Sequence, residues 1–190
     1  MTYYNPKLEE ADLYERLYQL DEDIDAYIDE KNLKIRHLDI VIAGSSALVF
    51  NNIHIKKTED IDIIKISNYI SEELLEKYDM NTRVGGLENF FPYNYQDRII
   101  KLNLKTFIAD YYILSLEDIV VAKIQADRGK DWEHLKNEEL LSRINWSLLK
   151  ICALEMEDSL LNDRQYQWFL SRYNYFVEVN GHEEIIIKNL

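Results

Sequence analysis

Cysteine, proline and glycine are scarce in this chain of 190 residues, and each shortage excludes a class of protein. Cys152 is the only cysteine, so no intramolecular disulfide can form, and its position within an apolar run is typical of a core residue. Five glycines and two prolines leave little room for long flexible linkers. The parts of the chain are therefore expected to pack closely.

Long hydrophobic runs are missing as well. No apolar stretch approaches the roughly 20 residues that a membrane-spanning helix needs. Residues 1–10 carry acidic side chains instead of the basic and then apolar stretches of a secretory signal. With the single cysteine, these absences make the cytoplasm the expected location, and no membrane partner is expected.

Positive charge is in short supply. Lysine and arginine total 22 against 35 aspartates and glutamates, which gives a net charge of −13. An acidic chain repels phosphate backbones at long range, which argues against a protein that slides on DNA but leaves room for a nucleic acid held by a local basic patch. His54 and His182 have no second histidine or cysteine at ligand spacing, so no zinc site is expected.

Apolar periodicity divides the first half of the chain into helices and strands. Pro6 is typical of a helix start, and the pattern predicts an amphipathic helix to about Lys31. The acidic residues Asp21, Asp23 and Asp25 are interpreted as a solvated face of that helix. Strands are predicted at 37–43, 60–66, 98–104 and 106–114, a short helix from Ala47, and a helix capped by Ser67 or Ser71 that runs to Tyr78.

The second half is mainly helical in its pattern. Residues 81–97 are aromatic-rich and irregular, which predicts a loop or a short helix. Ser115 with Asp118 three residues later is typical of a capped helix start. Helices are predicted at 116–127, 131–141, 146–161 and 162–177.

The order of these elements predicts an α/β or α+β fold, with a small mixed sheet flanked by helices and a helical C-terminal part. We expect one domain over residues 1–142, including the N-terminal helix. Residues 143–190 are expected to form a helical extension packed on it.

The residues from Ile40 to Ile66 carry the chemistry. An apolar strand ends at a Gly44-Ser45 turn, and Asp60 and Asp62 follow about fifteen residues later on the next strand. Side chains two apart on a strand point the same way, and two such carboxylates repel unless a cation lies between them. Magnesium prefers a few carboxylates together with phosphate oxygens. A glycine turn before a short helix offers backbone N–H groups and close approach to a phosphate. The pattern therefore predicts a metal ion and a triphosphate at one place.

The run Ala-Gly-Ser-Ser-Ala-Leu followed by Asp-Ile-Asp resembles the signature of the nucleotidyltransferase superfamily, a Gly-Ser or Gly-Gly turn followed by a D-x-D strand. The later segments Ser115–Lys123 and Arg128–Trp132 sharpen the match. They are similar to the AbiEii-type toxin nucleotidyltransferases and their relatives, which include the bacterial family known as domain of unknown function 6036. The resemblance covers about residues 38–135 and implies a minimal nucleotidyltransferase core.

The resemblance implies a role for each matching residue. Gly44, Ser45 and Ser46 would bind the nucleotide, and Asp60 and Asp62 would bind Mg²⁺ or Mn²⁺. Further along the chain, Lys123 and Lys130 would meet the phosphates, Asp131 would orient Lys123 or act as a further acid, and Asp110 is the candidate third carboxylate.

The leading hypothesis is therefore an enzyme that moves an NMP from an NTP such as ATP to a hydroxyl of tRNA or protein. The resemblance further suggests a toxin of a toxin–antitoxin or phage-defence system, with a cognate antitoxin as partner. Three alternatives stay open: a catalytically degenerate relative that binds nucleotide or a partner protein as a regulator, a D-x-D glycosyltransferase, and a haloacid-dehalogenase-like phosphatase. Purely structural interpretations also stay open. In these, Asp60 and Asp62 are charged residues on an exposed strand edge, and Lys123 is a lysine whose aliphatic chain is buried while its amine reaches solvent.

Overall fold

The computed structural model describes residues 6–55, 58, 60–65, 70–82 and 88–186. The chain divides into two compact units. The sheet unit consists of residues 1–86 and 99–114, and the helical unit consists of residues 87–98 and 115–190. The domain boundary expected after residue 142 stays a prediction.

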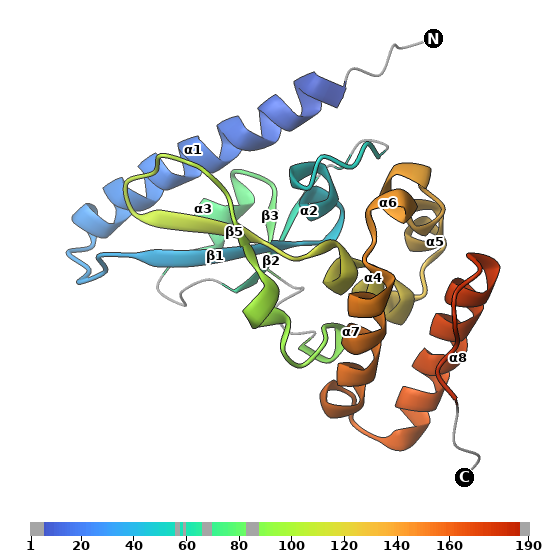
Figure 1. The fold of residues 1–190 in the computed structure, drawn as a ribbon. Helices are drawn as coiled ribbons and strands as arrows, with labels where there is room; N and C mark the ends of the chain where they lie inside the picture. The colour runs from blue at the N-terminus through green and yellow to red at the C-terminus, as the bar shows by residue number, and fades with distance from the viewer. Residues whose placement is uncertain (1–5, 56–57, 59, 66–69, 83–87, 187–190) are drawn as a thin grey trace. The chain divides into compact units, whose positions relative to one another are not determined.

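The sheet unit contains a five-stranded mixed sheet in the order β3-β2-β1-β5-β4 (Figure 1). The central strand β1 runs antiparallel to β2 and parallel to β5, while β3 and β4 form short edges. The strands are β1 Leu38–Ala43, β2 Ile61–Lys65, β3 Met80–Asn81, β4 Ile100–Lys101 and β5 Ala109–Ile113. The expected small mixed sheet is confirmed.

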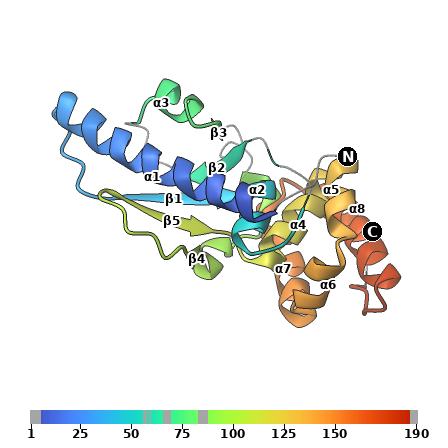
Figure 2. The same ribbon diagram turned by 90° about the horizontal axis from the view of Figure 1, so that it is seen from above.

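The described residues of this unit form the α-helices α1 Pro6–Glu30, α2 Gly44–Phe50 and α3 Glu72–Glu76. The long helix α1 covers one face of the sheet (Figures 1 and 2). The Tyr111 hydroxyl donates a hydrogen bond to the Leu17 carbonyl oxygen at 2.9 Å, which ties β5 to that helix. Leu17, Ile40 and Tyr111 are all almost completely buried, so the core lies between α1 and the central strands.

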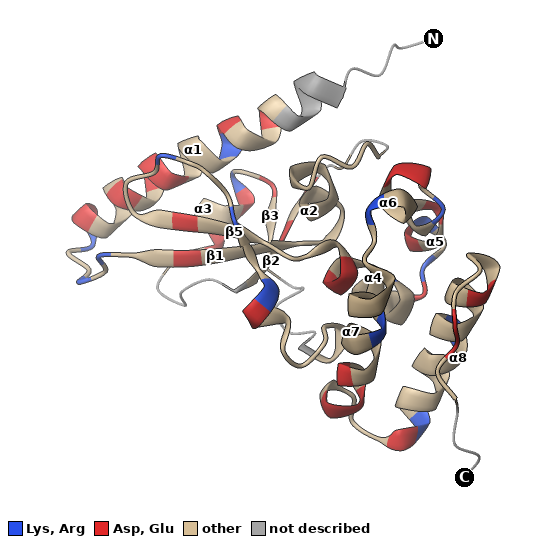
Figure 3. Cartoon of the chain, viewed as in Figure 1, with Lys and Arg blue, Asp and Glu red and all other residues tan. Residues whose placement is uncertain are grey.

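The interpretation of Asp21, Asp23 and Asp25 in α1 as a solvated face is wrong for Asp21 and Asp23. Asp21 is only 1% exposed, and its carboxylate accepts hydrogen bonds from the backbone N–H groups of Phe107, Ile108 and Ala109. Asp23 is also engaged, because Lys77 forms an ion pair with it. Acidic residues recur along the coloured part of helix α1 (Figure 3), and their number does not show which of them turns inward.

Within residues 88–98 and 115–186, the described part of the helical unit, there are two 3₁₀ segments and five α-helices. Helix α4 packs against α5, α7 and α8, so it forms the centre of the unit. The elements are η2 Glu88–Phe90, η3 Tyr95–Arg98, α4 Leu116–Ala126, α5 Gly129–Leu135, α6 Glu138–Arg143, α7 Trp146–Ser159 and α8 Asp163–Val179. Four of the five helices begin at a side chain that accepts a backbone hydrogen bond, namely Ser115, Asn137, Asn145 and Asn162.

Arg98 joins three elements of the helical unit. From the end of η3, its guanidinium donates to both carboxylate oxygens of Asp118 on α4 and to Glu155 on α7, with Nη2 distances of 2.8 and 2.7 Å. Asp118 is completely buried and also accepts the Ser115 hydroxyl hydrogen at 2.6 Å. The carboxylate at the start of α4 is therefore fully paired.

The fold class is α+β, as expected, and the helical C-terminal part is confirmed. The single helix expected over 131–141 is wrong, because α5 ends at Leu135 and Asn137 caps a new helix. The strand expected over 98–104 shortens to β4, and the helix expected to reach Tyr78 ends at Glu76. Ser71 caps that helix; Ser67 lies outside the described residues. Within the described part of the chain, no helix combines the length and the apolar character needed to cross a membrane.

Candidate active site

The turn after β1 is shaped by Gly44. This residue follows Ala43, the last residue of the strand, and has a φ of +64°, a left-handed conformation that glycine adopts without the steric cost of a side chain. Helix α2 starts at the same residue. In the antiparallel pairing of β1 with β2, Ala43 lies opposite Asp62. The expected turn and the expected carboxylate are therefore neighbours.

The Asp62 carboxylate fills the space that a side chain at position 44 would need. A Cβ atom built on Gly44 would lie 2.0 Å from Asp62 Oδ2 and 3.0 Å from Cγ. No real Cβ atom is found so close to an oxygen. The lack of a side chain at Gly44 thus serves the close approach of a carboxylate to the backbone, whereas the sequence suggested the approach of a phosphate.

Asp62 is half-buried and held on one side by a third strand. Asn81 on β3 donates a hydrogen bond from its side-chain amide to Asp62 Oδ1 at 3.1 Å. Asp60 directly precedes β2, two residues before Asp62, and its side chain is exposed; its backbone carbonyl accepts a hydrogen bond from the Thr58 hydroxyl at 3.1 Å. Two carboxylates with hard oxygen atoms beside an open glycine turn are a donor set that fits Mg²⁺.

The two serines of the turn differ. Ser45 is half-buried, whereas Ser46 is completely buried. The Ser46 hydroxyl donates to the Ala43 carbonyl oxygen at 3.0 Å, so it is engaged within the turn.

Asp110 lies elsewhere on the sheet. In the parallel pairing of β1 with β5 it is opposite Asp39, four residues before Ala43. At about 3.3 Å per residue, that is about 13 Å along the strand from the end where Asp62 lies. The structure does not bring Asp110 together with Asp60 and Asp62.

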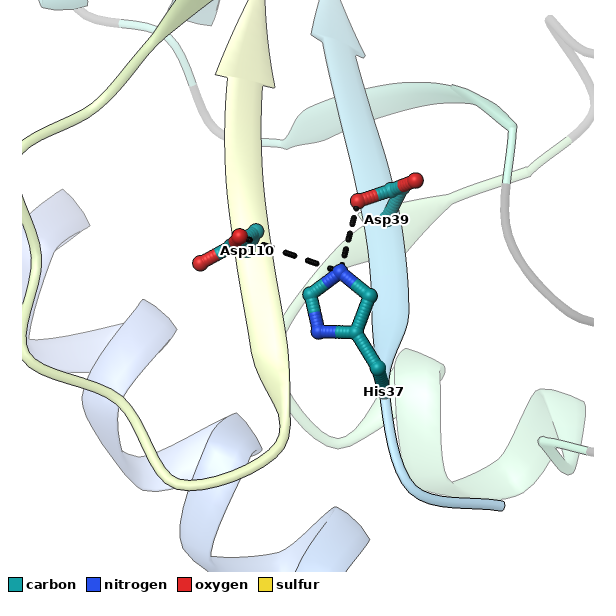
Figure 4. A group of neighbouring side chains, drawn as sticks. All are labelled: His37, Asp39 and Asp110. Atoms are coloured by element: carbon teal, nitrogen blue, oxygen red, sulfur yellow. Dashed lines mark hydrogen bonds and ion pairs between the residues drawn. The ribbon is translucent and has the colours of Figure 1, made fainter.

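Asp110 instead belongs to a group with His37 and Asp39 (Figure 4). His37 Nε2 lies 3.0 Å from Asp39 Oδ1 and 3.7 Å from Asp110 Oδ2. Their ligand atoms lie within 4.8 Å of one another, and among the described residues this is the group of three that a metal ion could join. Lys101 already forms an ion pair with Asp110, and that hydrogen bond raises the pKa of Lys101. The group thus already has a cation from the chain itself, the Lys101 ammonium, beside its Asp110 carboxylate.

The helical unit holds the remaining predicted residues. Lys123 on α4 is 4% exposed, and its Nζ donates to Asp131 Oδ1 at 3.0 Å. The other oxygen of this carboxylate accepts from Arg128 Nε at 2.6 Å. His134 Nδ1 lies 3.1 Å from Lys123 Nζ. An ammonium group can only donate, so Nδ1 is the acceptor and the proton of the neutral ring is on Nε2. Lys130 on α5 is exposed.

Burial and charge shift the pKa values in this cluster. Burial lowers the pKa of Lys123 and outweighs the opposing attraction of Asp131. Burial acts to raise the pKa of Asp131, but hydrogen bonds from Arg128 and Lys123 outweigh it, so that pKa falls. Burial and then the charge of Lys123 lower the pKa of His134 to about 4, so the imidazole is neutral at pH 7.

Residues 15–180 match the family described as "Nucleotidyltransferase of unknown function (DUF6036)". The chain belongs to this nucleotidyltransferase family. The comparisons with curated proteins and with solved structures gave no match. The resemblance seen in the Gly-Ser turn, the D-x-D strand and the later lysine segment is therefore confirmed at the level of the family.

The sequence alone assigned no role to two side chains of this nucleotidyltransferase-family chain, Asn81 and His134. Asn81, which holds Asp62, carries no local signal, because its contact depends on how β3 pairs with β2. His134 does carry a local signal. It lies three residues after Asp131 on the same helix, and this spacing puts both side chains on one face.

Proposed function

We propose that the protein is a magnesium-dependent nucleotidyltransferase that moves an NMP from an NTP to a hydroxyl group. The observation that carries this proposal is the contact of the Asp62 carboxylate with the backbone of Gly44, in a chain that belongs to a nucleotidyltransferase family. The contact joins the D-x-D strand and the glycine turn at one end of the sheet. Neither motif alone would be specific.

In the proposed site Asp60 and Asp62 hold Mg²⁺ or Mn²⁺. Asn81 and Gly44 support this assignment, because Asn81 donates a hydrogen bond to the Asp62 carboxylate and Gly44 leaves room for it beside the turn. When bound, the metal ion would supply positive charge at the phosphate oxygens. Gly44 and Ser45 are proposed to receive the triphosphate. Asp110 is left out, since it lies in register with Asp39.

The role of Lys123 and Lys130 at the phosphates, with Asp131 orienting Lys123, is part of the proposal. It is supported by the resemblance and by the 3.0 Å contact between Lys123 and Asp131 within the helical unit.

The proposed reaction is an in-line displacement at the α-phosphorus. The acceptor oxygen forms a bond to that phosphorus while the bond to the bridging oxygen breaks and pyrophosphate leaves. The hydroxyl proton passes to a carboxylate of the site or to water. Positioning and charge neutralisation by the residues of the site carry the rate.

The acceptor is proposed to be tRNA or a protein side chain, and the biological role that of a toxin in a toxin–antitoxin or phage-defence system with a cognate antitoxin. Resemblance to AbiEii-type toxins is the support for this part. The net charge of −13 makes a long-range attraction to RNA unfavourable, so recognition of tRNA would need a local basic patch.

A second candidate is a degenerate relative that binds a nucleotide or a partner without transferring. The placement of Asp110 favours it, because β5 brings no third carboxylate to the end of β1 where Asp62 lies. It predicts nucleotide binding without release of pyrophosphate.

The test incubates the full chain with each α-³²P-labelled NTP, with Mg²⁺, and with total tRNA or total protein. We expect metal-dependent labelling that is lost in Asp62→Asn and strongly reduced in Asp60→Asn. Asp39→Asn is the matched control, because it makes the same change of charge at the other end of the strands. Full labelling by Asp62→Asn would refute the proposed function. A magnesium-dependent rise in Tm with an NTP but no transfer to any acceptor would establish the second candidate.

A further inference from the structure

The ammonium group of Lys123 has one more N–H donor than it has hydrogen-bond acceptors among the described residues. An ammonium group carries three N–H donors, and the described residues supply two acceptors, Asp131 Oδ1 and His134 Nδ1. The side chain is 96% buried, so water satisfies the third hydrogen poorly. A buried donor without an acceptor is costly, which points to an acceptor that the chain itself does not provide.

The charge around Lys123 indicates what that acceptor is. Lys123, Arg128 and Lys130 bring three positive charges to the cluster, and Asp131 brings one negative charge. The imidazole of His134 is neutral and adds none. The cluster therefore carries an excess of positive charge in a chain whose net charge is −13. An anion with several oxygen acceptors, such as a phosphate, suits this environment.

The two acceptors, Asp131 and His134, affect the Lys123 ammonium group in different ways. Asp131 is completely buried and is also bound by Arg128, so its carboxylate is fixed. His134 takes a second N–H bond and so holds the ammonium group from another side, and the tetrahedral geometry at Nζ then leaves the third N–H bond in one direction. A neutral acceptor does this without cancelling the positive charge, whereas a second carboxylate would cancel it.

We propose that His134 is the positioning residue that directs the third hydrogen of Lys123 toward the phosphate group that Lys123 binds in the proposed function. The inference rests on the proposed function and deepens it, because it assigns a role to a residue that the sequence left without one. His134 does not touch the substrate and acts through Lys123.

The experiment measures the affinity of the full chain for each NTP with Mg²⁺ and for inorganic tripolyphosphate. Lys123→Gln should weaken binding of both by tenfold or more, and His134→Ala by roughly tenfold, the usual size of one hydrogen bond to a charged group. The matched control for charge is Lys136→Gln, since Lys136 is exposed and pairs with Glu133. It should bind as the wild type does.

A conservative variant separates positioning from structure. The Asn side chain can place its carbonyl oxygen where His134 Nδ1 lies, so His134→Asn should bind within about threefold of the wild type. Retained near-ultraviolet circular dichroism shows that each variant is folded. The ¹⁵Nζ resonance of Lys123 should also shift when tripolyphosphate is added, and a role confined to folding would not produce that shift.

The outcomes separate this inference from the proposed function. If Asp62→Asn loses magnesium-dependent NTP binding while Lys123→Gln or His134→Ala keeps full affinity, the inference is overturned and the proposed function stands. If His134→Asn binds as weakly as His134→Ala, the positioning role of His134 is overturned. If the wild type binds no NTP under any condition, the proposed function fails and the inference fails with it.

Discussion

The Asp62 carboxylate occupies the position in which any residue other than glycine at position 44 would carry its Cβ atom. The 2.0 Å separation between that atom and Asp62 Oδ2 links two sequence motifs that are otherwise separated by a helix and a loop. Gly44 is constrained twice, by its φ of +64° and by this carboxylate. The two residues therefore depend on each other, and substitutions at these positions should not have additive effects.

The first prediction concerns this coupling. Gly44→Ala should destabilise the fold by more than the roughly 1–2 kcal/mol of a left-handed non-glycine residue, because the new methyl group also displaces Asp62. Asp62→Ala removes the carboxylate that would be displaced. In that background Gly44→Ala should cost at least about 1 kcal/mol less, a coupling typical of residues in contact. Urea unfolding of the four chains measures it, and additive effects would contradict the contact.

The second prediction concerns Asp110. Asp110→Asn should keep labelling activity within about twofold of the wild type, because Asp110 pairs with Lys101 near the start of β5 and lies far from Asp62 along the strands. Loss of this ion pair should have little effect on stability, because solvent screens the exposed Lys101 charge. The labelling assay with Asp62→Asn alongside checks it. A loss of activity as large as that of Asp62→Asn would restore Asp110 as a catalytic carboxylate.

The sequence predicted what is encoded locally. The turn at Gly44, the two strands around it and the cap at Ser115 each depend on residues close together in the chain, and all are present. The register between β1 and β5 depends on how distant segments pair. A shift of four residues would have brought Asp110 beside Ala43, and no local pattern excludes it.

The misinterpretation of Asp21 has a similar origin. At helical spacing, Asp21, Asp23 and Asp25 look equally exposed, and hydrophobic patterning gives no reason for a buried acid. The reason lies 86 residues away, where the backbone N–H groups that follow Thr106 need an acceptor.

The third prediction tests that acceptor. Asp21→Ala removes the carboxylate from three backbone donors and should destabilise the fold by about 2–3 kcal/mol. Glu22→Gln is the matched control on the same helix, because Glu22 is exposed and its change should stay within about 0.5 kcal/mol. Urea unfolding followed by far-ultraviolet circular dichroism measures both. Equal stability of the two variants would show that Asp21 does not anchor the segment before β5.

The fourth prediction concerns acid stability. The pKa of His134 is about 4 in the folded chain, below its ordinary value of 6.5. Between pH 4 and pH 6.5, His134 is therefore protonated in the unfolded chain and neutral in the folded chain. The stability that the neutral ring contributes is therefore fully present above pH 6.5 and is lost as the pH falls toward 4. The groups acting on His134 are Lys123, Arg128 and Lys130, which oppose its protonation, and Asp131, which favours it. In His134→Asn the fall in Tm between pH 6.5 and 4.5 should be smaller than in the wild type. Parallel curves for the two chains would contradict the low pKa.

The fifth prediction concerns Arg98 and the helical unit. Among the described residues, Arg98→Ala would leave the carboxylate of Asp118, which is completely buried, with the Ser115 hydroxyl as its remaining polar partner. Removing one member of a buried ion pair costs about 3–5 kcal/mol, because the remaining charge stays desolvated. Arg98→Lys should recover only part of this, since an ammonium group cannot serve Asp118 and Glu155 with the fork that the guanidinium provides.

The readout for Arg98 is specific to its unit. The three tryptophans of the chain, Trp132, Trp146 and Trp168, all belong to the helical unit, so their fluorescence follows the unfolding of that unit. Arg164→Ala is the matched control, because Arg164 is exposed and lies over the exposed ring of Trp168. The fluorescence transition in urea should move to clearly lower concentration for Arg98→Ala and stay near the wild-type value for the control. If both variants unfold at the same urea concentration, the pairing of Arg98 with Asp118 and Glu155 does not stabilise the helical unit.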